Sequence, residues 1–337
     1  MHNRDKTIDL FRVIGLLAII LAHVSAPAVI FQLRNFDVVL MVLLTGVSYE
    51  LSTSKPKTMH QYLSYVYRRF KRLIIPTYFF LIVYFGLANV LNHLNAISLS
   101  YSIEDYIDSF LLLSGQPNTN GIGYVWIMRI YFLTSLLLPF ARIISEKVST
   151  KLYLSILLAL LILYTLLLNV PVNTSSILGM LFENIILYMI GYGLVAAFGL
   201  VICTFTKREY GVGIVIAFVV FLISAFTIKS YTQIAKYPPH IYFFSYAFIV
   251  IFLLFFFREV QIMKWLSEQL IVRWISQNSL WIYFMHIIPV KLYECGIIRL
   301  RWDNFITRYI VVLTIAFVLV FIKNAILHYA ESKRRHG

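Results

Sequence analysis

Long apolar runs separated by short polar and basic segments dominate the 337-residue chain. A helix that crosses the hydrocarbon layer of a bilayer needs roughly 20 mainly apolar residues. By that measure the pattern predicts ten membrane-spanning helices, at 8–27, 36–53, 73–92, 123–141, 152–170, 180–200, 211–228, 240–257, 274–293 and 305–323. The predicted fold class is therefore all-α, a polytopic membrane protein with about ten transmembrane helices.

Three segments between these runs predict helical pieces that do not cross the membrane. Residues 54–72 indicate a basic inner helix or a re-entrant piece, and residues 101–116 indicate a short outer helix. Residues 258–273 are typical of an amphipathic helix that lies on the inner surface. Since no soluble segment separates from the rest, we predict a single transmembrane domain over residues 1–337.

The basic residues are distributed unequally between the two sides of the membrane. Cytoplasmic loops of membrane proteins carry an excess of Lys and Arg. With the N-terminus inside, the predicted inner segments hold most of the Lys and Arg residues. The longest outer segment, 93–122, holds none and carries Glu104, Asp105 and Asp108. Both termini are therefore predicted to be cytoplasmic.

Composition excludes two other classes of protein. Hydrophobic residues make up 60% of the chain and charged residues only 13%, whereas soluble proteins carry about 25% charged residues. A net charge of +14 would suit nucleic-acid binding. However, the basic residues lie in short clusters between apolar runs, so we expect no nucleic-acid partner.

Arg12 and His23 lie within the first predicted span. They are eleven positions apart, which on a continuous helix places both on one face, separated by about 16 Å along the axis. One interpretation is a polar shaft that crosses most of the membrane. The alternative is that Arg12 reaches the inner lipid phosphates and His23 forms a hydrogen bond between helices.

Further ionisable side chains are candidates for supporting roles. Asp37 begins the second span, where it would either orient the His23 imidazole or cap the helix N-terminus. Arg129 lies about two turns into the fourth span. It would either form an ion pair with Glu183 of the sixth span, which we favour, or polarise an acyl carbonyl.

The third and ninth spans supply the remaining candidates. Arg69 and Arg72 form a basic cluster next to the third span, and such clusters also serve as topology signals or contacts for anionic lipids. Ser279, Tyr283 and His286 share one helical face of the ninth span. His286 is a second candidate for polar chemistry, although a hydrogen bond in helix packing is the favoured role. No Cys/His cluster has the spacing of a metal site.

Five segments together carry a resemblance to the acyltransferase 3 family. The first has Arg12 and His23 separated by ten residues, and the second ends near Thr45–Gly46. The third has Arg69 and Arg72 followed by Pro76. The last two are GYVWIMRIYFLTSLLLPF at 123–140 and NSLWIYFMHII at 278–288. The resemblance covers the whole chain. The second segment departs from it, with Val39 in place of a common Pro and Thr45 in place of Ser.

The resemblance implies transfer of an acyl group, usually acetyl, from cytoplasmic acyl-coenzyme A to a hydroxyl of a cell-surface glycan or lipid. His23 is then the expected catalytic base and Arg12 its support, because a neutral imidazole accepts a proton near neutral pH. Arg69 and Arg72 are expected to bind the phosphates of the donor.

The sequence therefore predicts a membrane O-acyltransferase, most simply an O-acetyltransferase that modifies an exported or lipid-linked polysaccharide. The expected location is the inner membrane of a bacterial cell, in contact with membrane lipids. Acetyl-CoA or another acyl-CoA is the expected donor, and no permanently bound cofactor or metal is expected. The alternative function is an exporter of polysaccharide or lipid-linked oligosaccharide, in which the same polar residues conduct the substrate.

Overall fold

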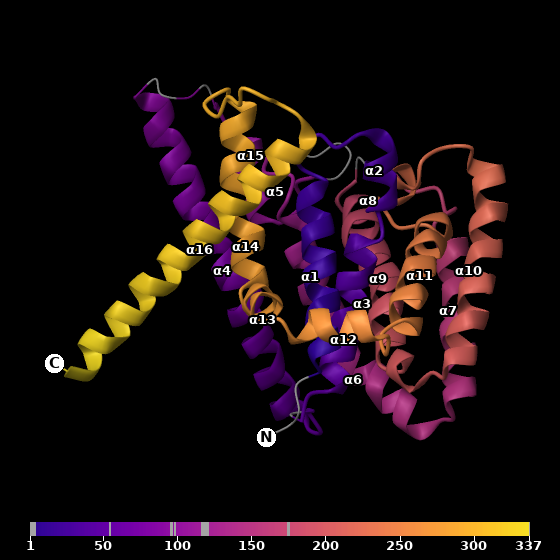
Figure 1. Cartoon of the computed structure of the whole chain (residues 1–337). Helices are drawn as coiled ribbons and strands as arrows, with labels where there is room; N and C mark the ends of the chain where they lie inside the picture. Colours follow the sequence, from indigo (N-terminus) through magenta and orange to yellow (C-terminus); the bar gives the residue numbers. More distant parts are fainter. Residues whose placement is uncertain are drawn as a thin grey trace. The chain divides into compact units, whose positions relative to one another are not determined.

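The computed structural model describes residues 5–53, 55–94, 97, 99–115, 121–173 and 176–336. Over these residues the regular structure is helical, apart from one isolated bridge between Lys236 and Pro239. Figure 1 labels the helices in chain order. The predicted all-α class is confirmed for the described part of the chain.

The chain groups into two compact units, and the first combines three separate stretches, Met1–Arg34, Ile82–Ser100 and Trp265–Gly337. Within this unit α1 packs against α13, α14 and α16, and α16 also packs against α14 and α15 (Figure 1). The single domain expected over 1–337 stays a prediction. The helices of the first unit are α1 (Lys6–Leu21), α2 (Ala28–Leu33), the C-terminal part of α4 (Met59–His93), α13 (Leu270–Gln277), α14 (Ser279–Met285), α15 (Ile287–Glu294) and α16 (Phe305–His336).

The second unit comprises Asn35–Leu81 and Tyr101–Lys264. Within it α9 packs against α3, α6 and α7, and α10 pairs with α11 (Figure 1). Its helices are α3 (Asp37–Glu50), the N-terminal part of α4, α5 (Ile103–Phe110), α6 (Trp126–Lys147), α7 (Thr150–Leu167), α8 (Ile177–Leu181), η1 (Phe182–Leu187), α9 (Tyr188–Gly199), η2 (Ile202–Thr204), α10 (Lys207–Ile228), η3 (Thr232–Ala235), α11 (Ile241–Phe256) and the first half of α12 (Gln261–Glu268).

Seven helical segments in the described residues are long and apolar enough to cross a membrane, or up to eight if a bent pair is one span. They overlap seven of the ten predicted spans. Large apolar side chains remain exposed along α7 and α10, as expected of surfaces that face lipid. The seven segments are Ala28–Glu50, Met59–His93, Trp126–Lys147, Thr150–Leu167, Leu178–Thr204, Lys207–Ile228 and Phe305–Lys333.

The other three predicted spans are shorter or broken. The span expected at 8–27 is the 16-residue helix α1. The one expected at 240–257 is the 16-residue helix α11, which is followed by α12 at a 90° bend. The one expected at 274–293 is divided among α13, α14 and α15. The count of ten is not confirmed, and the cytoplasmic position of the termini stays a prediction.

Helix α4 corrects the prediction for residues 54–72. From Met59 onward this segment continues without a break into the next span and forms one 35-residue helix with Pro76 in its interior. A proline lacks the backbone N–H that would bond the carbonyl four residues earlier. The neighbouring Thr77 hydroxyl donates to the Leu73 carbonyl at 2.6 Å. The helix nevertheless continues past a residue that we expected near a helix end.

The two other non-spanning helices were predicted more closely. Helix α5 lies inside the predicted segment 101–116 and begins with a capping box, in which Ser102 and Asp105 each bond the other's backbone N–H. The segment 258–273 is helical as expected, but Gln269 adopts an extended conformation and divides it into α12 and the start of α13.

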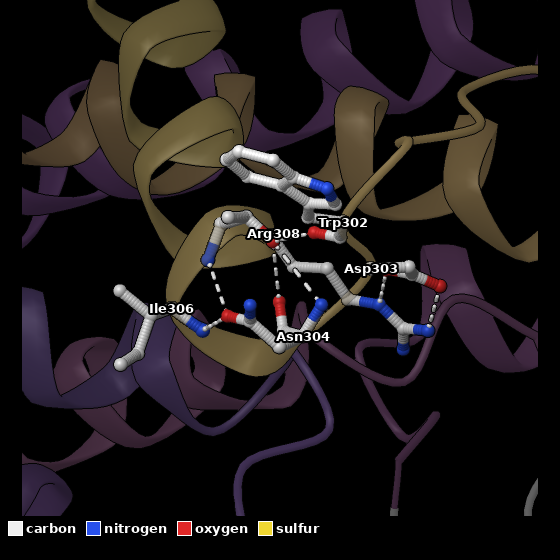
Figure 2. A network of polar contacts seen from close by, with 6 residues as sticks. Trp302, Asp303, Asn304, Ile306 and Arg308 are labelled. Carbon is white, nitrogen blue, oxygen red and sulfur yellow. Dashed lines mark hydrogen bonds and ion pairs between the residues drawn. The ribbon is translucent and has the colours of Figure 1, made fainter.

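The start of α16 is fixed by a polar network (Figure 2). The Asn304 side chain accepts hydrogen bonds from the backbone N–H groups of Ile306 and Thr307, each at 3.0 Å. The Arg308 guanidinium binds both carboxylate oxygens of Asp303 at 2.5 Å. This hydrogen bond from Arg308 lowers the pKa of the Asp303 carboxyl, so the contact persists into mildly acidic solution. The network therefore defines the boundary between loop and helix.

Two glycines set the contact between α3 and α9. A Cβ atom on Gly46 would lie 1.8 Å from the Ala196 carbonyl oxygen, and one on Gly199 would lie 2.3 Å from the Leu43 carbonyl oxygen. Helices in a bilayer gain van der Waals contact when small residues let their backbones approach. Thr45–Gly46, singled out in the sequence, is therefore a packing motif.

We expect Gly46→Ala to lower the free energy of unfolding by about 1–3 kcal/mol, because the added methyl group forces α3 and α9 apart. Thermal unfolding of the purified full chain in detergent measures this change. Gly211→Ala in α10 is the matched control, since no atom lies within 4 Å of a Cβ there. The control should unfold at the same temperature or slightly above it, and equal losses in both variants would contradict the close contact.

Candidate functional site

Arg12 lies on α1 in a compact set of buried polar side chains. Its Nη1 atom donates to the Asp9 carboxylate at 3.0 Å and to the Ser276 hydroxyl at 2.9 Å. The Ser276 hydroxyl in turn donates to the same Asp9 oxygen at 2.8 Å. Asp9 is 5% and Ser276 4% exposed. The guanidinium therefore has a fixed counter-charge, which the interpretation of an arginine reaching for lipid phosphates did not include.

His23 lies just beyond the end of α1. The helix ends at Leu21, and the His23 backbone N–H donates to the Ile20 carbonyl at 3.0 Å in a tighter turn. The spacing of a continuous helix therefore does not extend to this residue. The expectation that Arg12 and His23 share one face of an unbroken helix is corrected: Arg12 lies in the middle of α1, and His23 lies just beyond the C-terminal end of this helix.

His286 is an aromatic partner of His23 in the first unit. The two imidazoles stack with centroids 5.4 Å apart and an angle of 29° between their planes. His286 is fully buried, and its Nδ1 atom makes a short contact with the Tyr283 carbonyl oxygen. The Tyr283 ring also lies beside it, with centroids 5.3 Å apart. The structure thus brings together two histidines that the sequence separates by most of the chain.

Ser279, Tyr283 and His286 lie along α14, and His286 is the residue at which α14 ends and α15 begins. Ser279 begins α14, and His286 follows its last residue, Met285. Tyr283 and His286 remain in contact. The chain turns at Asn278, before these three residues, and at His286, the last of them. The backbone N–H of His286 still donates to the Ile282 carbonyl at 3.0 Å, so the helical spacing of the three residues is kept and their common role stays a prediction.

Arg69 and Arg72 lie one turn apart on α4 in the second unit. Arg69 Nε donates to the Tyr65 hydroxyl at 3.2 Å, and that hydroxyl donates to the Ser135 carbonyl at 3.0 Å. Arg72 is exposed. One arginine is thus anchored through a tyrosine to α6, while the other projects from the helix surface. The arrangement suits a pair of cations that bind a polyanion.

Glu50 lies at the C-terminal end of α3. Its carboxylate lies 2.9 Å from Arg142 Nε and 3.2 Å from Lys55 Nζ. These groups belong to the second unit and compensate one another's charge. We assign this cluster to structure, since it joins the ends of two packed helices, α3 and α6.

Asp37 lies in the first turn of α3 and is 1% exposed. Lys236 Nζ lies 4.0 Å from its carboxylate and is itself nearly buried. The Asp37 carboxylate also accepts the backbone N–H of Val38 at 2.7 Å. Asp37 therefore has a cationic partner inside the second unit, and its predicted role in orienting His23, which belongs to the first unit, stays a prediction.

Arg129 lies in the first turn of α6 and is 6% exposed. None of its three guanidinium nitrogens has a hydrogen-bond partner within the described residues. The expected ion pair with Glu183 does not form among them, because Glu183 lies in the π-helical turn η1 and stays half-exposed. The guanidinium instead lies over the Tyr188 ring, 5.6 Å from its centroid. The ion pair is therefore corrected to a cation–π contact.

Three partners of the candidate residues were not predicted from the sequence. The pairing of Asp9 with Arg12 could have been predicted, since an acidic residue three positions before an arginine on a helix forms a side-chain pair. Ser276 is 264 positions away from Arg12, and Lys236 is similarly remote from Asp37. No local pattern in the sequence predicts a contact between residues so far apart along the chain.

Comparison with known protein families identifies a match over nearly the whole chain. A family model of the acyltransferase domain of the acyltransferase 3 type matches residues 5–325. Comparisons with curated proteins and with solved structures give no significant match. The matched range contains every candidate residue named above.

We expect Asp9→Asn and Arg12→Gln to show coupled effects on stability, because each removes a partner of the same ion pair. Thermal unfolding of both single variants and of the double variant measures the coupling, expected at about 0.5–3 kcal/mol. Strictly additive losses would mean that Arg12 draws its stabilisation from lipid phosphates rather than from Asp9.

Proposed function

The chain belongs to the acyltransferase 3 family, and we propose that it transfers an acyl group, most simply acetyl, from cytoplasmic acyl-CoA to a hydroxyl of an exported polysaccharide or lipid-linked glycan. Family membership and the apolar helices make it a multi-pass membrane acyltransferase. The proposed location is the inner membrane of a bacterial cell. Acyl-CoA serves as a substrate rather than as a resident cofactor.

The stacking of His23 on His286, in the unit that also holds Arg12, is the observation that carries the proposal. In the proposed step His23 accepts the proton of the acceptor hydroxyl while the hydroxyl oxygen attacks the thioester carbon. The carbon–sulfur bond then breaks, and the coenzyme A thiolate leaves and takes up a proton. An imidazole suits this role because its ordinary pKa lies near neutral pH.

His286 is proposed as a positioning residue for His23. Its ring is buried, and the contact between Nδ1 and the Tyr283 carbonyl fixes its orientation. A ring held in this way limits the rotation of the imidazole that stacks on it. General bases act efficiently when they are held in a productive geometry, and a second histidine provides that constraint here.

Arg12 is proposed to stabilise charge on the donor. Its pairing with Asp9 and Ser276 fixes the guanidinium, yet the side chain remains 25% exposed. A fixed cation that is still accessible can bind a phosphate of the incoming donor or the negative charge that develops on the thioester oxygen. The counter-charge of Asp9 lowers the cost of holding a cation within an apolar bundle.

Arg69 and Arg72 are proposed to bind the phosphates of coenzyme A. Their spacing of three residues places both side chains toward one side of α4. A guanidinium forms paired hydrogen bonds with phosphate oxygens, and two neighbouring guanidinium groups match the charge of a polyphosphorylated donor. The anchoring of Arg69 through Tyr65 supports a fixed position for one of them.

We expect His23→Ala to lower acyl transfer about 10²–10⁴-fold, as expected for the loss of a general base. The measurement is the O-acetyl content of the surface glycan in cells that express the variant, together with turnover by the purified protein. The glycan should still reach the cell surface. Loss of export, with normal acetylation of the glycan that stays inside, would favour the exporter function instead.

We expect Arg69→Ala combined with Arg72→Ala to raise the acyl-CoA concentration needed for half-maximal rate by tenfold or more, since each charged hydrogen bond contributes about 1.5–3 kcal/mol. Steady-state kinetics of the purified protein measure this shift. Arg68→Ala is the matched control, because Arg68 lies on the same helix, is exposed and bonds only locally to Ser64 in the described structure. An unchanged donor dependence in the double variant would assign the pair to lipid contacts.

A further inference from the structure

A buried group of aromatic and cationic side chains lies at the N-terminal end of α6 in the second unit. The Trp126 ring lies 5.1 Å from the Tyr237 ring and 6.3 Å from those of Tyr188 and Tyr192. Trp126, Tyr188 and Tyr192 are each at most 5% exposed, whereas Tyr237 is half-buried at the edge of the group. The proposed chemistry at His23 and at Arg69 and Arg72 uses none of these four residues.

Arg129 adds a positive charge to this group without a hydrogen-bonding partner. Its side chain is more than nine-tenths buried, and its Nε, Nη1 and Nη2 atoms form no hydrogen bond within the described residues. A buried charge is expected to be paired, because its desolvation is otherwise uncompensated. The contact with the Tyr188 ring at 5.6 Å covers one face of the guanidinium but satisfies no N–H donor.

The neighbouring charges do not balance Arg129. Lys236 Nζ lies 5.6 Å from the centroid of the Trp126 ring, and it pairs with Asp37 at 4.0 Å. The Asp37 carboxylate is thus already matched by a lysine, and the half-exposed Glu183, which acts electrostatically on Tyr188, accepts no hydrogen bond from Arg129 in the described residues. Among Arg129, Lys236 and Asp37 a single positive charge remains, so an incoming anion would neutralise the group.

The helix end itself favours an anion. Helix α6 has 22 residues and begins after Val125, which provides no side-chain cap. The first backbone N–H groups of a helix and its dipole together attract negative charge. Side chains lean toward the N-terminus of their helix, so Arg129 in the first turn is directed toward this end. The fully buried Tyr192 hydroxyl, which also has no hydrogen-bond partner in the described residues, adds a polar group to the same cluster.

We infer that this cluster at the start of α6 binds an oxyanion, a carboxylate or a phosphate, that is carried by the acceptor glycan. The inference rests on the proposed acyltransferase function and assigns the acceptor to the anionic glycans. The guanidinium of Arg129 forms paired hydrogen bonds with the oxyanion.

The aromatic and cationic cluster and the proposed donor site lie beside different parts of α6. Arg69 is anchored beside Ser135, and Phe70 packs on Phe132 with ring centroids 6.0 Å apart. Ser135 follows Arg129 by six positions, which corresponds to about 9 Å along a helix axis. A phosphate of coenzyme A is therefore the competing anion, and the test must distinguish it from the acceptor.

The test is a binding titration of the full chain in discs of uncharged lipid, at constant ionic strength. The anionic probes are glucuronate and glucose 1-phosphate, glucose is the neutral probe, and coenzyme A represents the donor. We expect at least one anionic sugar to bind tenfold or more tightly than glucose. Arg129→Gln should abolish that preference, and Arg129→Lys, which keeps the charge, should retain part of it.

Arg142→Gln on the same helix is the matched control, because Arg142 already pairs with Glu50 and Glu146. This variant should keep the preference for anionic sugars. Equal binding of glucose and both anionic sugars by the unmodified protein overturns the inference, as does a preference that survives in Arg129→Gln. So does a result in which the substitution weakens only coenzyme A, or only stabilisation by phosphatidylglycerol added to the discs.

Thermal unfolding without any probe gives a second readout. If the guanidinium is unpaired, Arg129→Gln should unfold at a temperature about 2–4 °C higher for each kcal/mol of relieved charge burial. A lower unfolding temperature would mark Arg129 as a structural group and overturn the inference. Neither measurement depends on turnover, so the loss of O-acetyl groups expected in His23→Ala tests the acyltransferase function separately.

Discussion

A charge placed in an apolar helix bundle must be compensated, and this constraint organises both units of the protein. In the first unit Asp9 and Ser276 surround Arg12, and in the second Lys236 lies against Asp37. Each arrangement joins segments that are remote in the sequence, so the polar contacts also determine how the apolar helices pack. Arg129 departs from the pattern, and its departure is most simply explained by a function that supplies the missing anion.

Two polar positions, one within α1 and one beyond its end, carry the proposed chemistry of the first unit. In the middle of the helix, a carboxylate and a hydroxyl fix Arg12. Beyond the end of the helix, His23 stacks on His286, whose own orientation is set by Tyr283. The segment from α13 to α15 supplies a partner at each position, Ser276 and His286, and it is broken at Asn278 and again at His286. The irregular helix is thus part of the site.

The sequence predicted the features that depend on local information and missed those that depend on distant contacts. The lengths of apolar runs located seven spans, because hydrocarbon thickness acts on each run independently. The break at His286 and the continuity of α4 through Pro76 depend on tertiary packing, which no local pattern reports. Candidate residues were found one by one from their charge. The partners Ser276 and Lys236 are polar side chains whose roles arise only when remote helices meet.

Helix α4 belongs to both units, since Leu81 ends the part assigned to the second unit and Ile82 begins the part assigned to the first. The arginines proposed to bind coenzyme A lie in the N-terminal part of this helix. Its C-terminal part belongs to the unit that contains the two histidines. A continuous helix transmits tilt along its axis, and a proline weakens it locally. Pro76 lies one turn beyond Arg72, in the part of α4 that belongs to the second unit, so any local bending at this proline acts on a single continuous helix that contributes residues to both units.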